Sequence, residues 1–303
     1  MDQERAEASD MGRGQPLGIP DHARAAAARW KLHGLEPLAR GAESLVVRAE
    51  DGEGTPWALK CRPPGDPGTE REAAALRLLA CERLVALKAV DAEAGVLWLE
   101  WVLPGHALAA ETDAAARDAF CQVAAALACA HPSGAPEGFP RLADQLSALD
   151  SWQNACSAAE SRAVAEVVAG AWRLAASPHR VVLLHGDLHD GNLLHRLQSS
   201  REGDGAMAAT AIDPKGVWGD PAYEPACFLM NRWVRRPWAV SAMQRYARGL
   251  SARLGLDEGR VWAWAGVHTA LSLAWSREDH AAMPAPSDPR WRVLQDWMRG
   301  AEA

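Results

Sequence analysis

An aspartate and an asparagine stand five residues apart in the run His185-Gly-Asp-Leu-His-Asp-Gly-Asn192, directly after the apolar stretch 181–184. In a loop of this length both side chains can face one point, where Asp187 can accept a proton and Asn192 can offer its amide oxygen to Mg²⁺. Asp213 follows at the end of a second short apolar run. Mg²⁺ takes oxygen ligands from one or two side chains together with substrate phosphates. A base, an amide ligand and a carboxylate ligand are the parts that phosphoryl transfer requires, so this spacing predicts a kinase site.

Turn formation is the ordinary alternative for Asp and Asn in a glycine-rich loop. Asparagine is rare in this chain, however, and occurs at positions 154, 192 and 231 alone. A chance match to His-x-Asp-x₄-Asn is therefore on the order of one in a hundred by composition. The strand-like run before the loop and Asp213 after it favour the catalytic interpretation.

Lys60 ends the strand predicted at 56–61, beside a glycine- and acid-rich turn, and from there it can reach phosphate oxygens. A surface lysine on an edge strand is the competing interpretation. A kinase lysine is held by a carboxylate from the next helix, and Glu72 is expected on the inner helix face because it lines up with Leu76 and Leu79. Because Thr69-x-x-Glu72 is also a capping box, both roles stay open for Glu72.

Two regions of different character must position these residues. The N-terminal region orders as helix, strand, strand, helix, strand, strand, whereas long helices dominate afterwards. We therefore predict an α+β chain with a flexible tail at 1–19, a small mixed N-lobe at 20–102 and a larger helical C-lobe at 103–303. The expected helices lie at 21–32, 69–81, 114–130, 157–176 and from 221 onward, and the expected strands at 43–50, 56–61, 85–90, 95–102, 181–184 and 209–213.

Composition excludes several classes of protein. The formal net charge is −7 and no Lys/Arg-rich run is present, which argues against nucleic-acid binding and suits a cationic small-molecule substrate. The six cysteines form no Cys-x-x-Cys pair, so we expect a reducing, cytoplasmic location without disulfides. No charge-free apolar run reaches membrane-spanning length, and no membrane partner is expected.

The sequence resembles the aminoglycoside/hydroxyurea resistance kinases, a family of kinase-like phosphotransferases. The resemblance implies the bilobal protein-kinase-like fold, ATP as the phosphoryl donor, Asp187 as catalytic base, and Asn192 and Asp213 as Mg²⁺ ligands. The run Ile-Asp-Pro-Lys-Gly…Gly-Asp-Pro is narrower than the His-Gly-Asp motif and points to the streptomycin branch. The resembling stretches are His185–Leu194, Ala211–Pro221, Trp57–Lys60, Val96–Trp101 and Leu273–Ser276.

The same resemblance assigns the segment 99–105 as the hinge, with the backbone of Glu100 and Val102 holding the adenine. Two places depart from the pattern of related kinases. Arg40-Gly-Ala-Glu-Ser44 stands where protein kinases carry a Gly-x-Gly-x-x-Gly loop over the phosphates. Glu224 follows Tyr223 where the family often has an aspartate, and it is a candidate supporting carboxylate.

The acceptor implied by this branch is a cationic aminoglycoside such as streptomycin, and Asp220, Glu278 and Asp279 are the carboxylates proposed to bind it. A solvated helix end is the alternative for Glu278 and Asp279. A metabolic kinase or a hydroxyurea kinase is the alternative enzyme, and a nucleotide-binding pseudokinase is the alternative from another class. Lys60, Asp187, Asn192 and Asp213 are all present, which argues against a pseudokinase. A protein kinase is disfavoured because no Ala-Pro-Glu segment follows Asp213.

Overall fold

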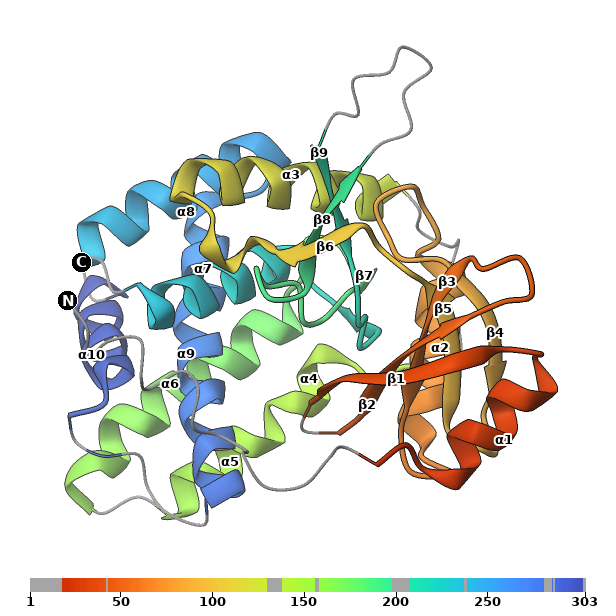
Figure 1. The fold of residues 1–303 in the computed structure, drawn as a ribbon. Helices are drawn as coiled ribbons and strands as arrows, with labels where there is room; N and C mark the ends of the chain where they lie inside the picture. The colour runs from red at the N-terminus through yellow and green to blue at the C-terminus, as the bar shows by residue number, and fades with distance from the viewer. Residues whose placement is uncertain are drawn as a thin grey trace, which may run out of the picture. The chain divides into compact units, whose positions relative to one another are not determined.

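The computed structural model describes residues 18–41, 43–129, 138–155, 158–197, 207–236, 239–280, 285 and 287–301. Most of the tail predicted at 1–19 lies outside the described residues. The chain divides into two compact units, one of Met1–Glu70 with Leu87–Trp101 and the other of Arg71–Ala86 with Val102–Ala303 (Figure 1). The first contains most of the sheet and the second most of the helices.

The first unit is built on a five-stranded antiparallel sheet with strand order β1-β2-β3-β5-β4. The predicted strands at 43–50, 56–61, 85–90 and 95–102 are confirmed with small shifts, and β1 is additional. The central strand β3 carries Lys60, which pairs with Val46 on one side and Leu97 on the other. The elements are α1 (Asp21–Arg29), β1 (His33–Arg40), β2 (Leu45–Glu50), β3 (Pro56–Cys61), the start of α2 (Pro67–Leu78), β4 (Leu87–Asp91) and β5 (Val96–Glu100).

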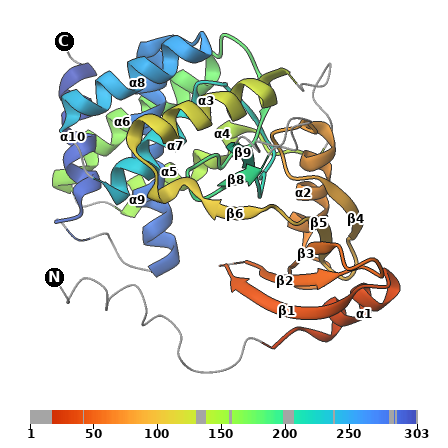
Figure 2. The same ribbon diagram turned by 45° about the horizontal axis from the view of Figure 1, so that its top comes forward.

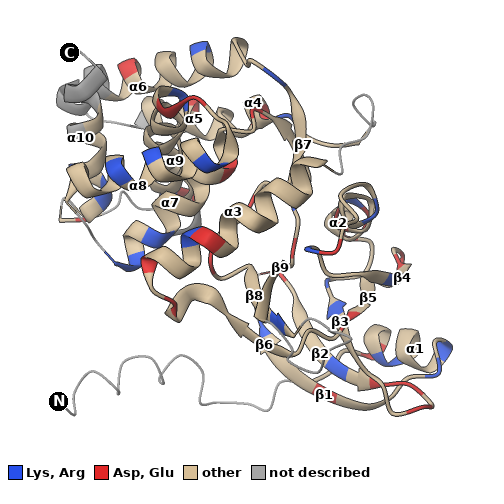
Figure 3. Ribbon diagram, turned by 90° about the horizontal axis from the view of Figure 1, so that it is seen from above, with Lys and Arg blue, Asp and Glu red and all other residues tan. Residues whose placement is uncertain are grey.

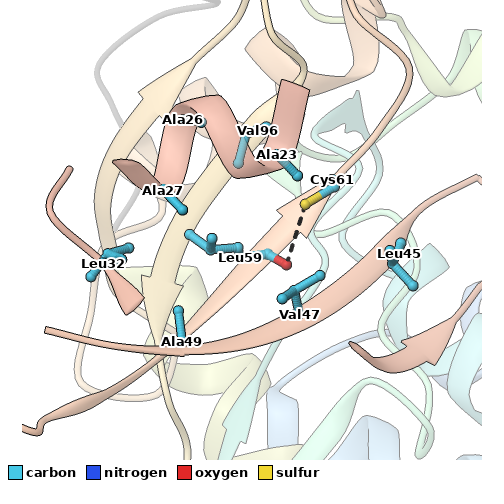
Figure 4. Close-up of a cluster of buried hydrophobic side chains, with 10 residues drawn as sticks. All are labelled: Ala23, Ala26, Ala27, Leu32, Leu45, Val47, Ala49, Leu59, Cys61 and Val96. Carbon is cyan, nitrogen blue, oxygen red and sulfur yellow. Dashed lines mark hydrogen bonds between the residues drawn. The ribbon is translucent and has the colours of Figure 1, made fainter. Parts of the chain in front are cut away.

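Small side chains pack α1 against this sheet. Ala23, Ala26 and Ala27 lie on one helix face at i, i+3, i+4 spacing and are fully buried. Figure 4 shows them in one cluster with Leu59 of β3 and with apolar residues of β2 and β5. The cluster is apolar throughout, and its one thiol, Cys61, has its pKa raised to about 12 by burial. This core therefore stabilises the unit and carries no chemistry of its own.

The second unit is mainly helical, and α9 runs through its middle against α5, α6, α7, α8 and α10 (Figure 2). Close approach of α10 to α9 requires a glycine, because a Cβ on Gly266 would meet the Trp297 ring at 2.2 Å. The helices are α3 (Asp113–Cys129), α4 (Leu142–Gln145), α5 (Ser147–Ala155), α6 (Ala158–Ala176), α7 (Tyr223–Arg235), α8 (Val240–Leu254), α9 (Glu258–His280) and α10 (Pro289–Ala301), with a 3₁₀ turn at Leu108–Ala110.

Two small antiparallel sheets interrupt the helices. β7 (Val182–Leu184) pairs with β10 (Val217–Gly219), and β8 (Leu193–Leu197) lies between β6 (Pro104–Ala107) and β9 (Met207–Ala211). The loop at 185–192 joins β7 to β8, and the segment at 212–216 joins β9 to β10. Because β7 pairs with β10 and β8 pairs with β9, the ends of these two connections lie side by side. The topology therefore brings the two predicted catalytic segments together. Within the described ranges, no helix is both long and apolar enough to cross a membrane.

Candidate active site

The loop between β7 and β8 folds back so that its two predicted functional residues touch. The Asn192 side-chain amide donates to the backbone carbonyl of Asp187 at 2.9 Å and lies 3.3 Å from its Oδ2. The backbone N–H of His189 also donates to the Asp187 carbonyl, at 3.0 Å. Because the amide nitrogen of Asn192 is directed at Asp187, its carbonyl oxygen is turned away and can serve as an acceptor or ligand.

His185 ties this loop to the segment that carries Asp213. Its Nε2 donates to the carbonyl of Ile212 at 2.9 Å, and its Nδ1 accepts from the backbone N–H of Asp187 at 3.3 Å. One donating and one accepting nitrogen describe a neutral ring, and burial lowers the pKa of His185 to about 4. The His185 carbonyl accepts from the N–H groups of Lys215 and Gly216. The ring and its backbone therefore hold both catalytic segments in one arrangement.

Asp213 occupies an uncommon backbone conformation beside Asn192. Its φ is +60°, a left-handed value that residues other than glycine seldom adopt. The preceding residue, Ile212, donates its N–H to the carbonyl of Asn192 at 3.0 Å, which fixes the two predicted metal ligands in neighbouring positions. Backbone strain of this kind clusters at functional sites, where the surrounding structure holds it in place.

The environment of Asp187 suits a general base. Its pKa is raised above the ordinary value, mainly because burial disfavours the charged form and also because the Asp213 carboxylate lies near. His189, Lys215 and the Asn192 amide act in the opposite direction. A third of the side chain remains exposed, so a substrate hydroxyl can reach it. A carboxylate with a raised pKa accepts a proton more readily than an ordinary aspartate.

A buried ion-pair network anchors the other end of the loop. Asp190 is 1 % exposed and accepts from Arg232 at 3.1 Å and from Arg235, both on α7. Arg232, also 1 % exposed, continues to Asp113 at the start of α3. Figure 3 shows acidic and basic segments adjoining where these two helices meet. Removing one partner from such a buried network is costly, so Asp190 holds the loop in position.

Glu224, at the start of α7, supports the loop through a hydrogen bond to its backbone. One carboxylate oxygen accepts from the backbone N–H of Gly186 at 3.0 Å, directly before Asp187. The side chain is buried, and burial raises the pKa of Glu224 to about 7, against the opposing influence of neighbouring backbone amides. Glu224 is thus placed as the supporting carboxylate for which its sequence position made it a candidate.

Of the predicted nucleotide-binding residues, Lys60 lies on β3 and is 6 % exposed, and Glu72 lies on α2 and is 3 % exposed. Lys60 belongs to the first unit and Glu72 to the second, and their pairing stays a prediction. Glu100 ends β5, and Val102 is the first residue of the second unit after the division. Their hinge role likewise stays a prediction.

The structure shows contacts of Asp220 that the sequence did not predict. It is 3 % exposed, and its Oδ1 accepts from the backbone N–H of Ala222. Its Oδ2 accepts from Arg260 and, at 2.9 Å, from the indole of Trp264, both on α9. These contacts engage both oxygens within the fold, and a role of Asp220 in binding the acceptor stays a prediction. Glu278 is exposed near the end of α9, and the side chain of Asp279 lies outside the described residues.

Lys215 is a site residue for which sequence reasoning predicted no role. Its Nζ lies 3.5 Å from Oδ1 of Asp213, and its side chain is 38 % exposed. The signal was present in the run Ile-Asp-Pro-Lys-Gly, which was used only to recognise a branch of the family. The structure shows that this lysine faces the same cluster as Asp187 and Asp213.

The residues present fit a hard divalent cation that is shared with phosphate oxygens. Among the described residues no group of three or more His, Cys, Asp or Glu side chains could hold a metal by itself. Asn192, whose amide oxygen is turned away from Asp187, and Asp213 are the two oxygen ligands predicted for it. Mg²⁺ is commonly held in this way, by one or two side chains plus substrate phosphates.

Comparison with known proteins agrees with this geometry. Residues 29–280 match the aminoglycoside/hydroxyurea antibiotic resistance kinase family. The chain is 31 % identical over 275 residues to a hydroxyurea phosphotransferase of Kitasatospora aureofaciens, covering 88 % of this chain and 76 % of that protein. It is 29 % identical over 289 residues to a streptomycin 6-kinase of Streptomyces griseus, covering 92 % and 89 %.

Among solved structures, an aminoglycoside phosphotransferase in complex with ADP and hygromycin B has a TM-score of 0.61 to this chain at 20 % identity. The similarity covers 93 % of this chain and 99 % of that one. The α+β fold is therefore that of the protein-kinase-like phosphotransferases. The family match spans most of the chain, and the named relatives are kinases of small molecules. The chain belongs to the aminoglycoside/hydroxyurea antibiotic resistance kinase family and is a small-molecule phosphotransferase.

Proposed function

We propose that this protein transfers the γ-phosphoryl group of ATP to a hydroxyl of a cationic aminoglycoside such as streptomycin. The observation that carries the proposal is the convergence of Asp187, Asn192 and Asp213 on one point, held there by His185. A base with two oxygen ligands near it is the arrangement that phosphoryl transfer needs. The similarity to streptomycin 6-kinase and to an aminoglycoside phosphotransferase that binds ADP and hygromycin B supports the choice of substrates.

In the proposed mechanism, Asp187 orients the acceptor hydroxyl and takes its proton as the oxygen attacks phosphorus. The new bond joins the acceptor oxygen to the γ-phosphorus, the bond from that phosphorus to the β,γ-bridging oxygen breaks, and ADP leaves with the electron pair. The raised pKa of Asp187 brings the base closer to neutral pH. Asn192 keeps the carboxylate oriented by donating to it, so most of the catalysis is positioning.

Asn192 and Asp213 would hold Mg²⁺, which neutralises phosphate charge when it is bound. Lys60, braced by Glu72, would grip the α- and β-phosphates, and the backbone of Glu100 and Val102 would hold the adenine. The pairing of Lys60 with Glu72 is proposed from the sequence alone.

The acceptor is proposed to be cationic because the chain is acidic and resembles the streptomycin branch. Since both oxygens of Asp220 are engaged within the fold, the proposal relies on the other two predicted carboxylates, Glu278 and Asp279. An exposed carboxylate such as Glu278 attracts a guanidinium group weakly through water and more strongly once the bound ligand excludes water.

Hydroxyurea is the second candidate acceptor, favoured by the 31 % identity to a hydroxyurea phosphotransferase. It is small and uncharged, so it would need none of the recognition carboxylates. The two candidates separate in one experiment, in which the protein is incubated with ATP, Mg²⁺ and either streptomycin or hydroxyurea and the products are analysed by mass spectrometry. Gain of one phosphoryl group on streptomycin supports the aminoglycoside assignment, and gain on hydroxyurea alone contradicts it. Transfer to neither compound, nor to a panel of other hydroxyl compounds, would contradict the proposed function.

A further inference from the structure

We propose that Lys215 is a catalytic residue of this kinase, whose ammonium group binds the phosphoryl group in transit and stabilises its charge in the transition state. This inference rests on the proposed function and adds to it a residue that the family resemblance did not assign. It concerns the β9–β10 connection at 212–216, which lies entirely within the second unit.

The backbone places Lys215 at the catalytic cluster. Its N–H donates to the carbonyl of His185 at 2.7 Å, two residues before Asp187 in the catalytic loop. The left-handed conformations of Asp213, with φ +60°, and Gly216, with φ +64°, turn the chain on both sides of it. A Cβ at Gly216 would meet the Phe139 ring at 2.5 Å, so this turn admits no larger residue without rearrangement. This turn therefore fixes the backbone position of Lys215.

The backbone of Lys215 is held firmly, but its side chain is held only loosely. Nζ lies 3.5 Å from Oδ1 of Asp213, at the far limit of a hydrogen bond, and the side chain is 38 % exposed. The positive charge lowers the pKa of Asp187, so its field reaches the base. A lysine that served only the fold would be expected to make a closer contact, as the arginines around Asp190 do. A half-exposed ammonium with one long contact can move to a phosphate oxygen at little cost.

The other cationic side chains around the loop either form ion pairs with Asp190 or have a pKa lowered by burial. Arg232 and Arg235 pair with Asp190, which is buried. His189 lies 3.7 Å from Asp187, but burial lowers its pKa, so its ring is mostly neutral at pH 7. In the described part of this cluster, Lys215 is therefore the side chain able to present positive charge to an incoming phosphate.

The chemistry of transfer needs such a charge. In the transition state the γ-phosphoryl group carries negative charge on its three equatorial oxygens, and an arginine that meets this charge in other phosphoryl-transfer enzymes contributes about 10³- to 10⁵-fold to turnover. In this chain Arg40-Gly-Ala-Glu-Ser44 replaces the glycine-rich loop that covers the phosphates in protein kinases. Lys215 supplies charge next to the base and takes no proton or bond itself.

The test compares Lys215→Met with Lys215→Arg and with Lys88→Met, a control that removes an exposed lysine from β4 of the first unit. We expect Lys215→Met to lower kcat with the best acceptor by about 100-fold or more. Its KM for ATP should stay within about threefold of the wild-type value, since the lost contact forms chiefly in the transition state. Lys215→Arg should recover part of the loss, and Lys88→Met should behave as the wild type.

A binding measurement separates catalysis from a structural role. Aluminium fluoride with ADP and Mg²⁺ mimics the phosphoryl group in transit, and it should tighten ADP binding to the wild type because enzymes bind transition-state analogues more tightly than substrates. We expect Lys215→Met to lose most of this tightening, while its affinity for ADP and Mg²⁺ without fluoride and its melting temperature stay unchanged. Equal loss of ADP affinity with and without fluoride, or a lowered melting temperature, would show that Lys215 only supports the fold and would overturn the inference.

The same measurements distinguish failure of this inference from failure of the proposed function. If the wild type phosphorylates an acceptor and Lys215→Met retains full turnover, the role of Lys215 is refuted and the kinase assignment stands. If the wild type neither phosphorylates an acceptor nor shows tighter ADP binding with fluoride, the proposed function and the inference fall together.

Discussion

The catalytic loop and the carboxylates predicted to bind the acceptor differ in how the protein holds them. Asp187 and Asn192 contact one another within a stretch of eight residues, and Asp187 keeps a third of its side chain exposed. Asp220 is instead buried, and its carboxylate accepts from the backbone N–H of Ala222, just before α7, and from Trp264 on α9. The proposed base is held firmly yet left accessible, whereas both carboxylate oxygens of Asp220 accept hydrogen bonds within the fold. Partner contacts and exposure together, and not charge alone, distinguish the two kinds of carboxylate.

Among the substitutions that test this comparison, we expect Asp187→Asn to have the largest effect on turnover. The substitution removes the base and keeps the shape of the side chain, so we expect kcat to fall by about 100-fold or more. The melting temperature and the affinity for ATP should change little, because the contacts of Asp187 within the loop are short-range and survive in asparagine. Steady-state kinetics and a thermal melt measure both. Near-normal turnover would show that Asp187 is not the base.

Asp213→Ala should come next, through the metal. Asp213 is a proposed Mg²⁺ ligand, so its loss should raise the Mg²⁺ concentration needed for half-maximal activity by about tenfold or more. Asn192→Ala is the matched comparison, and we expect it to shift the Mg²⁺ titration less because the amide carries no charge. A Mg²⁺ titration that is unchanged by Asp213→Ala would exclude this metal site.

Asp220→Asn reverses the pattern, because it should affect stability and not catalysis. Either orientation of the asparagine amide sets its NH₂ against a donor, the backbone N–H of Ala222 or the groups of Arg260 and Trp264. We expect the free energy of unfolding to fall by about 3–5 kcal/mol, as for loss of one partner from a buried ion pair. Chemical denaturation measures this loss. A raised KM for the acceptor without lost stability would instead support Asp220 as a substrate ligand.

Glu224→Gln tests whether the buried carboxyl that supports the loop makes the stability of the fold depend on pH. Because burial raises the Glu224 pKa to about 7 from 4.5, the folded protein keeps this proton in a pH range where the unfolded chain releases it. Wild-type stability should therefore fall, through this group, as pH rises towards and through 7. Between pH 5 and pH 8 we expect Glu224→Gln to gain about 2 kcal/mol relative to the wild type.

Two buried histidines change the stability of the fold with pH in the direction opposite to Glu224. His185 and His268 have pKa values lowered by burial to about 4, so they contribute stability above pH 6.5 that is lost as pH falls towards 4. Both histidines are present in the wild type and in Glu224→Gln, so their effect cancels in the difference. A stability difference that does not change between pH 5 and pH 8 would show that Glu224 has an ordinary pKa.

The sequence predicted those elements whose side-chain pattern reports their burial. The strand at 45–50 alternates between buried and half-buried residues, and the helix at 21–29 places its alanines on one face. β1 was not predicted, because its residues are almost all exposed and it contains Pro37 and two register shifts. It exists through backbone pairing with β2, and no side-chain periodicity reports that. β6, which contains Pro104 and Gly105, was likewise not predicted, and it too exists through backbone pairing, with β8.

The candidate site divides in a similar way. The spacing of Asp187, Asn192 and Asp213 could be predicted because a short loop between apolar runs limits where its side chains can go. Arg232 could not be predicted as an anchoring partner, since it lies on α7, 42 residues beyond Asp190, whereas Glu224 was a candidate only through the family resemblance. Lys215 had no role assigned from the sequence, because the role now proposed for it depends on a turn that only the structure shows. The contact of Asp220 with Arg260 on α9 could not be predicted, because nothing in the sequence around Asp220 indicates it.

Glu278→Gln has the smallest expected effect and decides whether the end of α9 recognises the acceptor. Glu278 is exposed, so its attraction to a guanidinium is screened by salt and amounts to less than about 1 kcal/mol. We expect KM for streptomycin to rise by about two- to fivefold at low ionic strength, with kcat and ATP affinity unchanged, and the effect to shrink as salt is added. Glu258→Gln at the other end of the same helix is the matched control, because Glu258 is occupied by Arg248. Equal responses of the two variants would mean that the charge of the whole protein attracts the acceptor. No response from Glu278→Gln would move acceptor recognition away from the end of α9, and the search would turn to the polar residues of α7 and α9 that surround His268.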